Sequence, residues 1–379
     1  MSKKDVKLLF LPGDGIGPEV LKEVTKIANW FNRHTHLNFV HDEGLIGGVA
    51  LDKYDTPLPD ETKKKADQAD AVMFGTVGGP QYDHLPFTKR PEQGLLDLRK
   101  HMGLYANLRP AHTFDSLTDS SALKLEKVRG LDILMIRELV GGVYHGEPRG
   151  IGYSPKQGRK GYNTICYSED EVRRIATVAF EAAQRGNKRL CAVDRANLLE
   201  SMQVWRDTVN NVAKLYPDVE FSNVYVDNVA MELVTNPTHF DLILTPNLLG
   251  DVLSDLAGAL TGSMGLLPSA SIGNKKESGF PSALYEPVHS SQPDIAGKGI
   301  ANPLAALSCF AMLLKHSLDE TDLALKLRVA IRNVVDNGAR TADFARNGEP
   351  ALKTAKIGDL LVKELDRITA AEKGTGTFG

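Results

Sequence analysis

The sequence has little of three things: cysteine, net charge and long apolar runs. Its three cysteines, Cys166, Cys191 and Cys309, are widely separated and lack the spacing of a zinc site. Their odd number favours reduced thiols over a disulfide framework. No apolar run approaches the ~20 residues that a membrane-spanning helix needs. We therefore expect a cytoplasmic protein that has no membrane partner.

The small net charge of −3 gives no reason to expect a nucleic-acid partner. The hydrophobic fraction of 42% and the charged fraction of 25% are typical of a globular protein. The chain of 379 residues is long enough for two domains or for one large α/β body with a sizeable core.

Short β-rich apolar segments alternate with amphipathic segments, which predicts a layered α/β fold. The expected strands are residues 6–11, 71–74, 133–136, 190–193, 224–226 and 242–244, and the expected helices are residues 18–31, 169–185, 200–215, 251–260, 302–317 and 319–337. We also expect an active-site loop over residues 77–90, which are rich in Gly and Pro, and a hairpin arm over residues 148–163.

The first predicted strand runs into Gly13-x-Gly15-x-Gly17. The third glycine comes one residue too early for the dinucleotide-binding pattern GxGxxG, and no acidic residue ends a clear second strand about 20 residues later. We expect a tight turn at the end of a core strand here, and no Rossmann site.

Three arginines lie in separate polar segments: Arg99, Arg109 and Arg137. Arg137 directly follows a predicted strand, and sites in open α/β sheets lie at strand ends. Converging guanidinium groups would bind a dicarboxylate in bidentate fashion. Each arginine taken singly is better explained as a member of a surface ion pair, so only the set favours a dicarboxylate site.

Two carboxylates stand four residues apart, at Asp251 and Asp255, and therefore share one helix face. Such a pair repels unless a cation lies between its members, and hard oxygen ligands favour Mg²⁺ or Mn²⁺. The alternative is a pair of aspartates that complements the dipole of a helix start, which suits Asp251 better than Asp255. Asp227, at the end of a predicted strand, would supply a third carboxylate.

Residues 286–303 form a polar, glycine-rich segment that leads into an apolar helix. Such a loop offers backbone amides, a histidine and an acidic group to a nucleotide. Asp294 would accept a hydrogen bond from a ribose 2′-hydroxyl and repel a 2′-phosphate, which favours NAD over NADP. A simple surface loop remains the alternative.

Taken together, these motifs resemble the isopropylmalate branch of the isocitrate/isopropylmalate β-decarboxylating dehydrogenase family. The resemblance runs over nearly the whole chain and is carried by Leu11–Glu19, Gly75–Pro80, Arg90–Arg99, Tyr105–Pro110, Arg137–Tyr144 and Gly262–Ala270. It implies a non-Rossmann α/β fold of two domains with the active-site cleft between them. Residues 1–104 and 262–379 would form the larger, nucleotide-side domain, and residues 105–261 a second domain with a dimerisation arm and the metal and substrate residues.

The resemblance implies NAD-dependent oxidative decarboxylation of 3-isopropylmalate or a related 3-substituted malate, as in leucine biosynthesis, by a homodimer with shared active sites. It implies that substrate is bound by Glu92, Leu95, Leu96, Arg99, Arg109, Arg137 and Leu198, with the leucines forming an apolar pocket. Tyr144 would protonate the enolate, and Mg²⁺ or Mn²⁺ would bind Asp251, Asp255 and Asp227 of the partner subunit. The NAD residues implied are Glu286, His289, Ser290, Gln292, Asp294, Ile295 and Asn302.

The chain departs from the family pattern at three places. Arg195 stands where the family has a catalytic lysine that shuttles a proton, and arginine does not give up its proton at physiological pH. Uncompensated, the change predicts a loss of ~10²–10⁴-fold, with Asp227 or water on the metal as the remaining base. Residues 290–292 read Ser-Ser-Gln in place of Gly-Ser-Ala, and residues 246–249 differ mildly.

These departures leave two hypotheses. The first is a working NAD-dependent dehydrogenase of a 3-alkylmalate. The second is a divergent paralogue with weak or no dehydrogenase activity, which serves as a binding or regulatory protein or acts on a different malate-like ligand. Retention of the arginines, the three aspartates and Tyr144 favours the first.

Overall fold

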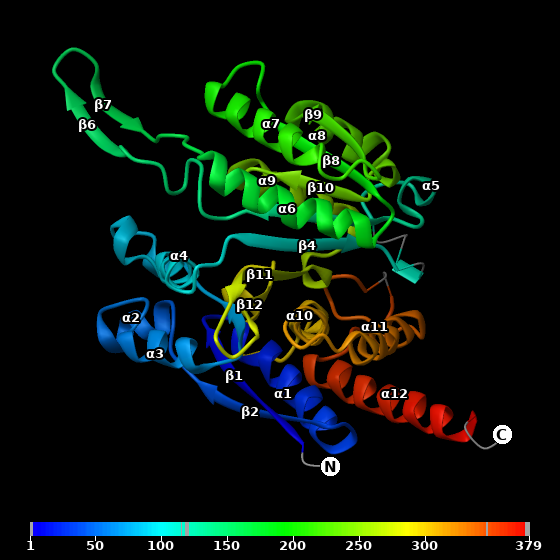
Figure 1. Ribbon diagram of the computed structural model, residues 1–379. Helices are drawn as coiled ribbons and strands as arrows, with labels where there is room; N and C mark the ends of the chain where they lie inside the picture. The colour runs from blue at the N-terminus through cyan, green and yellow to red at the C-terminus, as the bar shows by residue number, and fades with distance from the viewer. Residues whose placement is uncertain (1–2, 115, 118–120, 346–347, 376–379) are drawn as a thin grey trace. The chain divides into compact units, whose positions relative to one another are not determined.

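The computed structural model describes residues 3–114, 116–117, 121–345 and 348–375. The chain divides into two compact units (Figure 1). The first unit comprises Met1–Leu104, Phe114–Ser121 and Thr261–Gly379, and the second comprises Tyr105–Thr113 and Ala122–Leu260.

The first unit is built on five strands in the order β2-β1-β3-β12-β11. Strands β2, β1, β3 and β12 run parallel to one another, whereas β11 is antiparallel to β12. Their bounds are β1 Lys4–Gly13, β2 Leu37–Glu43, β3 Ala71–Thr76, β11 Pro268–Lys275 and β12 Pro281–Pro287. The carboxyl ends of β1, β3 and β12 therefore lie at one edge of this sheet, where ligand sites of open parallel sheets are found.

Helices pack on this sheet and bury its core. α10 packs against β11, β12 and α1, and Phe310 on α10 lies 5.9 Å from Phe31 between ring centroids. Burial of such aromatic side chains is a main source of the unit's stability. The helices are α1 Gly17–His34, α2 Gly48–Tyr54, α3 Asp60–Gln68, α4 Pro91–His101, α10 Leu304–His316, α11 Thr321–Asp336 and α12 Thr354–Thr375, with 3₁₀ turns η1 Pro80–Tyr82, η2 Phe87–Lys89, η5 Met264–Leu266 and η6 Pro293–Ile295.

The second unit has five strands in the order β4-β5-β10-β8-β9, of which only β4 is antiparallel to its neighbour. Arg137 pairs with Thr245 and Asp194 with Tyr225, so these strand ends share one edge. The strands are β4 Ala106–His112, β5 Asp132–Glu138, β8 Arg189–Asp194, β9 Glu220–Tyr225 and β10 Leu242–Thr245, and the helices are α5 Leu125–Val128, α6 Glu169–Arg185, α7 Glu200–Ala213, α8 Val226–Thr235 and α9 Asn247–Thr261, with η4 Pro237–His239.

A separate hairpin, β6 Gly150–Ser154 and β7 Gly158–Tyr162, projects from the second unit (Figure 1). The predicted arm over residues 148–163 is thus confirmed, as is the layered α/β fold, and each strand and helix expected from the apolar pattern overlaps an observed element of the same type. No helix of the described residues is long and apolar enough to cross a membrane.

Two local expectations are wrong. Asp227 does not end a strand, because β9 stops at Tyr225 and Asp227 is the second residue of α8. Helix α9 begins at Asn247, four residues before Asp251. The sequence analysis also gave no strand for residues 106–112, because a strand that carries Asn, Arg and Pro lacks an apolar run.

Candidate functional site

In the second unit, two buried arginines converge on one carboxylate. Arg137, at the end of β5, donates from Nε and Nη2 to Asn247 Oδ1 at 3.0 and 2.9 Å, and from Nη1 to Asp251 Oδ1. Arg109 on β4 places Nη2 3.7 Å from Asp251 Oδ1 and Nη1 3.7 Å from Asp255 Oδ1. We call this group of Arg109, Arg137, Asp251, Asp255 and Tyr144 the arginine–aspartate cluster.

Neutral side chains hold the two guanidinium groups in place. Arg109 donates from Nε to Asn107 Oδ1 at 2.7 Å and from Nη1 to Ser254 Oγ at 2.6 Å. Asn107 pairs directly with Arg137 in the β4–β5 ladder, and Arg109 lies two residues further on, so the side chains of Asn107 and Arg109 share one sheet face.

The sequence analysis did not identify Asn107, Asn247 or Ser254 as site residues. A signal for two of them was present, because Asn247, Asp251, Ser254 and Asp255 follow the spacing of one helix face. They form a polar stripe on the otherwise apolar helix α9.

The two carboxylates of α9 have different electrostatic surroundings. Burial raises the pKa of Asp251, but the charges of Arg137 and Arg109 and a hydrogen bond from Tyr144 Oη, 2.9 Å from Oδ2, outweigh it and leave this pKa lowered. For Asp255, burial outweighs the attraction of Arg109 and leaves the pKa raised. Because α9 begins at Asn247, Asp251 lies beyond the first turn, which excludes the helix-dipole alternative for this residue.

Arg195 and Asp227 meet at the ends of neighbouring strands of the same unit. Strands β8 and β9 are parallel and in register, and Arg195 Nη1 lies 2.6 Å from Asp227 Oδ2. The hydrogen bond from Arg195 lowers the pKa of Asp227. Within the described part of the chain, no three His, Cys, Asp or Glu side chains gather as a metal site.

The backbone around Arg195 is fixed by its neighbour. Asp194 is fully buried, and its carboxylate accepts hydrogen bonds from Ala196 N at 2.9 Å and from Arg206 Nε at 2.7 Å. These hydrogen bonds hold the Asp194 side chain in the interior, and Arg195, the next residue, is half-buried at the strand end. Leu198, in the turn that follows, is 65% exposed.

In the first unit, the predicted substrate residues of α4 share one helix face. Glu92, Leu95, Leu96 and Arg99 are spaced i, i+3, i+4 and i+7 and are at least partly exposed, whereas Leu98 on the other side is buried. Arg99 Nη2 donates to Glu286 Oε1 at 2.7 Å. Glu286 is therefore a buried strand residue of β12 that pairs with Arg99, and it does not belong to the loop after β12.

The loop between β12 and α10, residues 288–303, holds the other predicted nucleotide residues, and we call it the nucleotide loop. Burial lowers the pKa of His289, whose Nε2 has no hydrogen-bond partner among the described residues. Asp294 is exposed and Ile295 half-buried. Asn302 Nδ2 donates to Asp343 Oδ2 at 3.0 Å. Asp343, which the sequence analysis missed, also accepts from Ser263 Oγ and from Thr341 Oγ1.

The two unusual side chains of the nucleotide loop are bonded to each other. Gln292 Nε2 donates to Ser290 Oγ at 2.8 Å. Gln292 has φ 45° and ψ 59°, a left-handed conformation that is unfavourable for a residue with a Cβ. No sequence pattern predicts this hydrogen bond, because it depends on the turn of the backbone.

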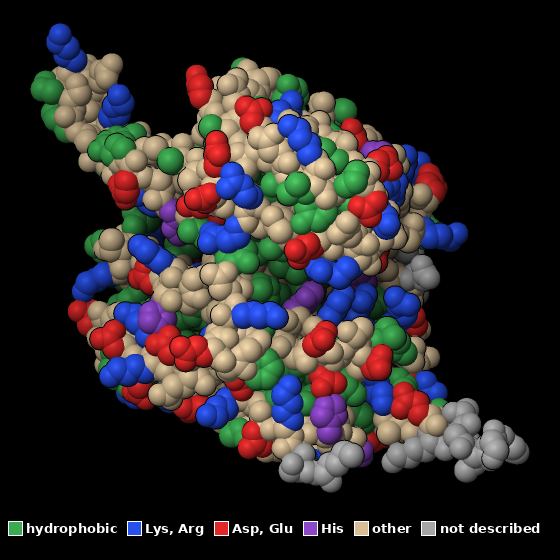
Figure 2. All heavy atoms as spheres, in the orientation of Figure 1, with side chains coloured by type: hydrophobic (Ala, Val, Ile, Leu, Met, Phe, Trp, Pro, Cys, Tyr) green, Lys and Arg blue, Asp and Glu red, His purple; other side chains and the backbone are tan. Residues whose placement is uncertain are grey.

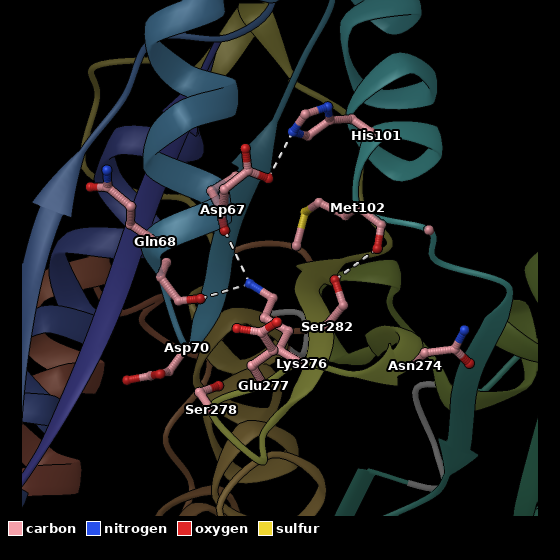
Figure 3. A pocket seen from close by; sticks show the side chains of 13 residues that line it. Asp67, Gln68, Asp70, His101, Met102, Asn274, Lys276, Glu277, Ser278 and Ser282 are labelled. Carbon is pink, nitrogen blue, oxygen red and sulfur yellow. Dashed lines mark hydrogen bonds and ion pairs between the residues drawn. The ribbon is translucent and has the colours of Figure 1, made fainter.

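A cavity of about 490 Å³ lies elsewhere in the first unit, between α3, the end of α4 and the β11–β12 turn (Figure 3). Its polar groups bond to one another: Lys276 Nζ donates to Ala69 O at 2.8 Å, Ser282 Oγ to Met102 O at 2.8 Å, and His101 Nε2 lies 2.8 Å from Asp67 Oδ1. The residues that line it include none of the predicted site residues.

The chain is similar to several known proteins over nearly its whole length. The family model described as isocitrate/isopropylmalate dehydrogenase matches residues 7–361. The chain is 52% identical over 365 residues to the 3-isopropylmalate dehydrogenase of Paramagnetospirillum magneticum, covering 96% of this chain and 99% of the relative. It is 53% identical over 360 residues to that of Ruegeria pomeroyi, covering 95% and 98%. A crystal structure of isocitrate dehydrogenase from Methylococcus capsulatus matches with a TM-score of 0.83 at 32% identity, covering 95% of this chain and 99% of that one.

Proposed function

The chain belongs to the isocitrate/isopropylmalate dehydrogenase family, and on that premise we propose that it oxidises and decarboxylates 3-isopropylmalate or a related 3-substituted malate. The reaction is of the leucine-biosynthesis type and uses NAD and Mg²⁺ or Mn²⁺. The observation that carries the proposal is the arginine–aspartate cluster, in which two buried guanidinium groups face the carboxylates that a metal would need.

Arg109 and Arg137 bind the malate carboxylates. Their guanidinium groups are anchored by Asn107, Ser254 and Asn247, so little side-chain freedom is lost when an anion binds. Arg99 contributes from the exposed face of α4, where Leu95 and Leu96 supply the apolar surface for the 3-substituent.

Asp251 and Asp255 suit a hard divalent cation, since both are carboxylates on one helix face. Mg²⁺ and Mn²⁺ accept few protein ligands and complete their shell with water and substrate. Asp227 of the partner subunit supplies the third carboxylate. When bound, the cation stabilises negative charge on the substrate 2-hydroxyl oxygen and on the later enolate.

Tyr144 holds the proton that the substrate carbon receives after carbon dioxide leaves. Burial, together with the charge of Asp251, raises the pKa of the Tyr144 phenol, so its oxygen keeps a proton at neutral pH. The hydrogen bond to Asp251 orients that oxygen within the cluster.

The nucleotide loop binds the adenosine half of NAD, with Asp294 accepting from the ribose hydroxyls and His289, Ser290, Gln292, Ile295 and Asn302 lining the site. The exposure of Asp294 supports this role, because its carboxylate is free to face solvent and ligand. Glu286 on β12 holds Arg99, and Glu92 lies on the same exposed face of α4 as Arg99, where it would contact the substrate. Bound there, NAD would supply the acceptor for the hydride that leaves the substrate carbon.

A second copy of the chain completes the active site. Apolar side chains are exposed in stripes on two helices, Met231 (59%) and Val234 on α8 and Leu248 and Val252 (63%) on α9, next to the helix positions of Asp227 and Asp251. Figure 2 shows hydrophobic atoms on the projecting hairpin too, which carries Ile151, Tyr153 and Tyr162. A second copy would cover both surfaces. Met231→Asp should yield monomer in sedimentation, and a dimer of unchanged strength would contradict this assembly.

The three thiols are free, with Cys191 and Cys309 buried, which is in keeping with a cytoplasmic location.

Arg195 decides between a working enzyme and the alternative, a paralogue with weak or no dehydrogenase activity. It bonds to Asp227 and lowers the pKa of that carboxylate, so Asp227 is a weaker base than a free aspartate, while Arg195 itself supplies only charge. NADH formation from 3-isopropylmalate with Mn²⁺, in the wild type and in Arg195→Lys, tests the proposal. We expect slow turnover that rises in the variant, by up to ~10²–10⁴-fold. Absence of turnover in both proteins would favour the alternative.

A further inference from the structure

A buried carboxylate outside the proposed chemistry joins several backbone segments of the first unit. Asp14, in the glycine turn after β1, is only 6% exposed. Its Oδ2 accepts from Gly48 N and Gly78 N, both at 2.8 Å, and its Oδ1 accepts from Val49 N at 2.9 Å. A single side chain thus satisfies three backbone donors that have no partner in regular secondary structure.

The glycine turn also contacts the nucleotide loop directly. Ile16 N donates to Ser291 O at 2.9 Å. Gly15 has φ +54°, and a Cβ at this position would lie 1.9 Å from the same oxygen. Only glycine allows this approach, so the turn is shaped to receive the loop at Ser291. A second bond, from Gly297 N to the carboxylate of Glu19 in α1, fixes the far side of the loop.

Gly78, one of the residues hydrogen-bonded to Asp14, lies next to α4. Gly78 has φ +104°, and a Cβ there would lie 2.4 Å from Glu92 Oε1. Asp14 binds the backbone of Gly78, and this backbone therefore lies against Glu92, the first residue of the predicted substrate face of α4. All these contacts belong to the edge where β1, β3 and β12 end.

We propose that Asp14 is a positioning residue, which ties the backbone beside Glu92 to the turn that supports the nucleotide loop and so sets both for binding NAD. A carboxylate suits this task better than an amide, because both of its oxygens accept hydrogen bonds. This explains why an aspartate stands between two glycines in a turn that makes no Rossmann site. The part of the inference that concerns NAD rests on the proposed function.

The experiment compares the wild type with Asp14→Asn, Asp14→Ala and the control Glu23→Gln. Glu23 is an equally buried carboxylate of the same unit, but it lies within α1 and pairs with Lys26. Hydrogen exchange is measured without ligand, and NADH affinity is measured by fluorescence titration without substrate. For Asp14→Ala we expect exchange at least about tenfold faster in residues 47–49, 76–79 and 288–292, and about tenfold weaker NADH binding.

Asp14→Asn should accelerate exchange in the same segments less, since its amide oxygen can still accept hydrogen bonds. This variant tests the inference if Asp14→Ala does not fold. Glu23→Gln should lower the unfolding temperature and leave NADH affinity and these three segments unchanged. Faster exchange spread evenly over the unit, or unchanged protection of residues 288–292 in the Asp14 variants, would overturn the inference. If the wild type itself binds no NADH, the proposed function fails, while the local exchange still decides whether Asp14 positions the loop.

Discussion

The arginine–aspartate cluster and the nucleotide loop are built in different ways. The cluster stands on β4, β5 and α9, and its charged side chains are bonded to one another and to neutral side chains of the same elements. The nucleotide loop has irregular backbone, held by Ile16 N at Ser291 and by Glu19 at Gly297. The cluster depends on side-chain identity, whereas the loop depends mainly on backbone contacts.

The nucleotide loop holds one of the three expected departures from the family pattern, whereas Arg195 and residues 246–249 lie in the second unit, the latter beside Arg137. The resemblance implies that the charged residues of the cluster are of the family type, and replacing one of them would leave a buried partner unpaired. The loop carries Ser290 and Gln292, whose side chains are exposed and bond to each other, so both changes fit without disturbing the backbone contact at Ser291. We therefore expect large effects from substitutions in the cluster and small ones in the loop.

The largest effect is expected at Arg137. Arg137→Gln removes a guanidinium that bonds to both Asn247 and Asp251, and breaking a buried charge pair of this kind should lower kcat/KM by roughly 10²–10³-fold. Arg137→Lys keeps the charge but loses the planar guanidinium with its paired donors, so it should recover only part of the activity. Steady-state kinetics with 3-isopropylmalate measures both variants.

The control for Arg137 is Arg173→Gln, at an exposed position of α6 whose side chain is 55% exposed. It should leave kcat/KM unchanged. If Arg137→Gln loses less than tenfold, the cluster does not bind the substrate carboxylates as proposed.

A smaller effect, on stability, is expected at Glu138. This carboxylate accepts from Val140 N and Gly141 N, in the segment that leads to Tyr144, and burial raises its pKa from 4.5 to about 7. Because the folded state favours the protonated form, its contribution to stability is full below pH 4.5 and is lost as the pH rises through about 7. The loss amounts to about 3 kcal/mol.

Glu138→Gln should remove this pH dependence of the unfolding free energy, measured by urea unfolding between pH 4.5 and pH 8. The matched control is Glu181→Gln, on the exposed side of α6, which should keep the slope of the wild type. An equal slope in wild type and Glu138→Gln would contradict the prediction.

From the sequence, it was possible to predict those strands and site residues that follow a regular apolar period or a regular spacing of charges. Apolar runs predicted the central strands, and the four-residue spacing predicted that Asp251 and Asp255 share one helix face, which the structure places beside Arg109. The sequence could not predict the bond between Arg99 and Glu286, which are 187 residues apart, because that bond depends on how α4 packs beside β12. It also misplaced the start of α9, because residues 247–250, Asn-Leu-Leu-Gly, carry no strong sequence signal of a helix start.

The smallest effects are expected within the Ser290–Gln292 pair. Gln292→Ala removes the hydrogen bond and keeps a Cβ at φ 45°, whereas Gln292→Gly also relieves the left-handed strain of ~1 kcal/mol. An exposed hydrogen bond of this kind is worth at most about 1 kcal/mol, so NADH affinity should fall no more than about fivefold in Gln292→Ala. Gln292→Gly should be at least as stable to heat as Gln292→Ala.

Ser290→Gly sharpens this comparison, because Ser290 supplies only the acceptor of the same hydrogen bond. If the two side chains act through that bond alone, the double variant Ser290→Gly/Gln292→Ala binds NADH no more weakly than either single variant. Additive losses would show that each side chain contacts the nucleotide separately. The loop would then depend on side-chain identity, as the arginine–aspartate cluster does, and the contrast between the two regions would be lost.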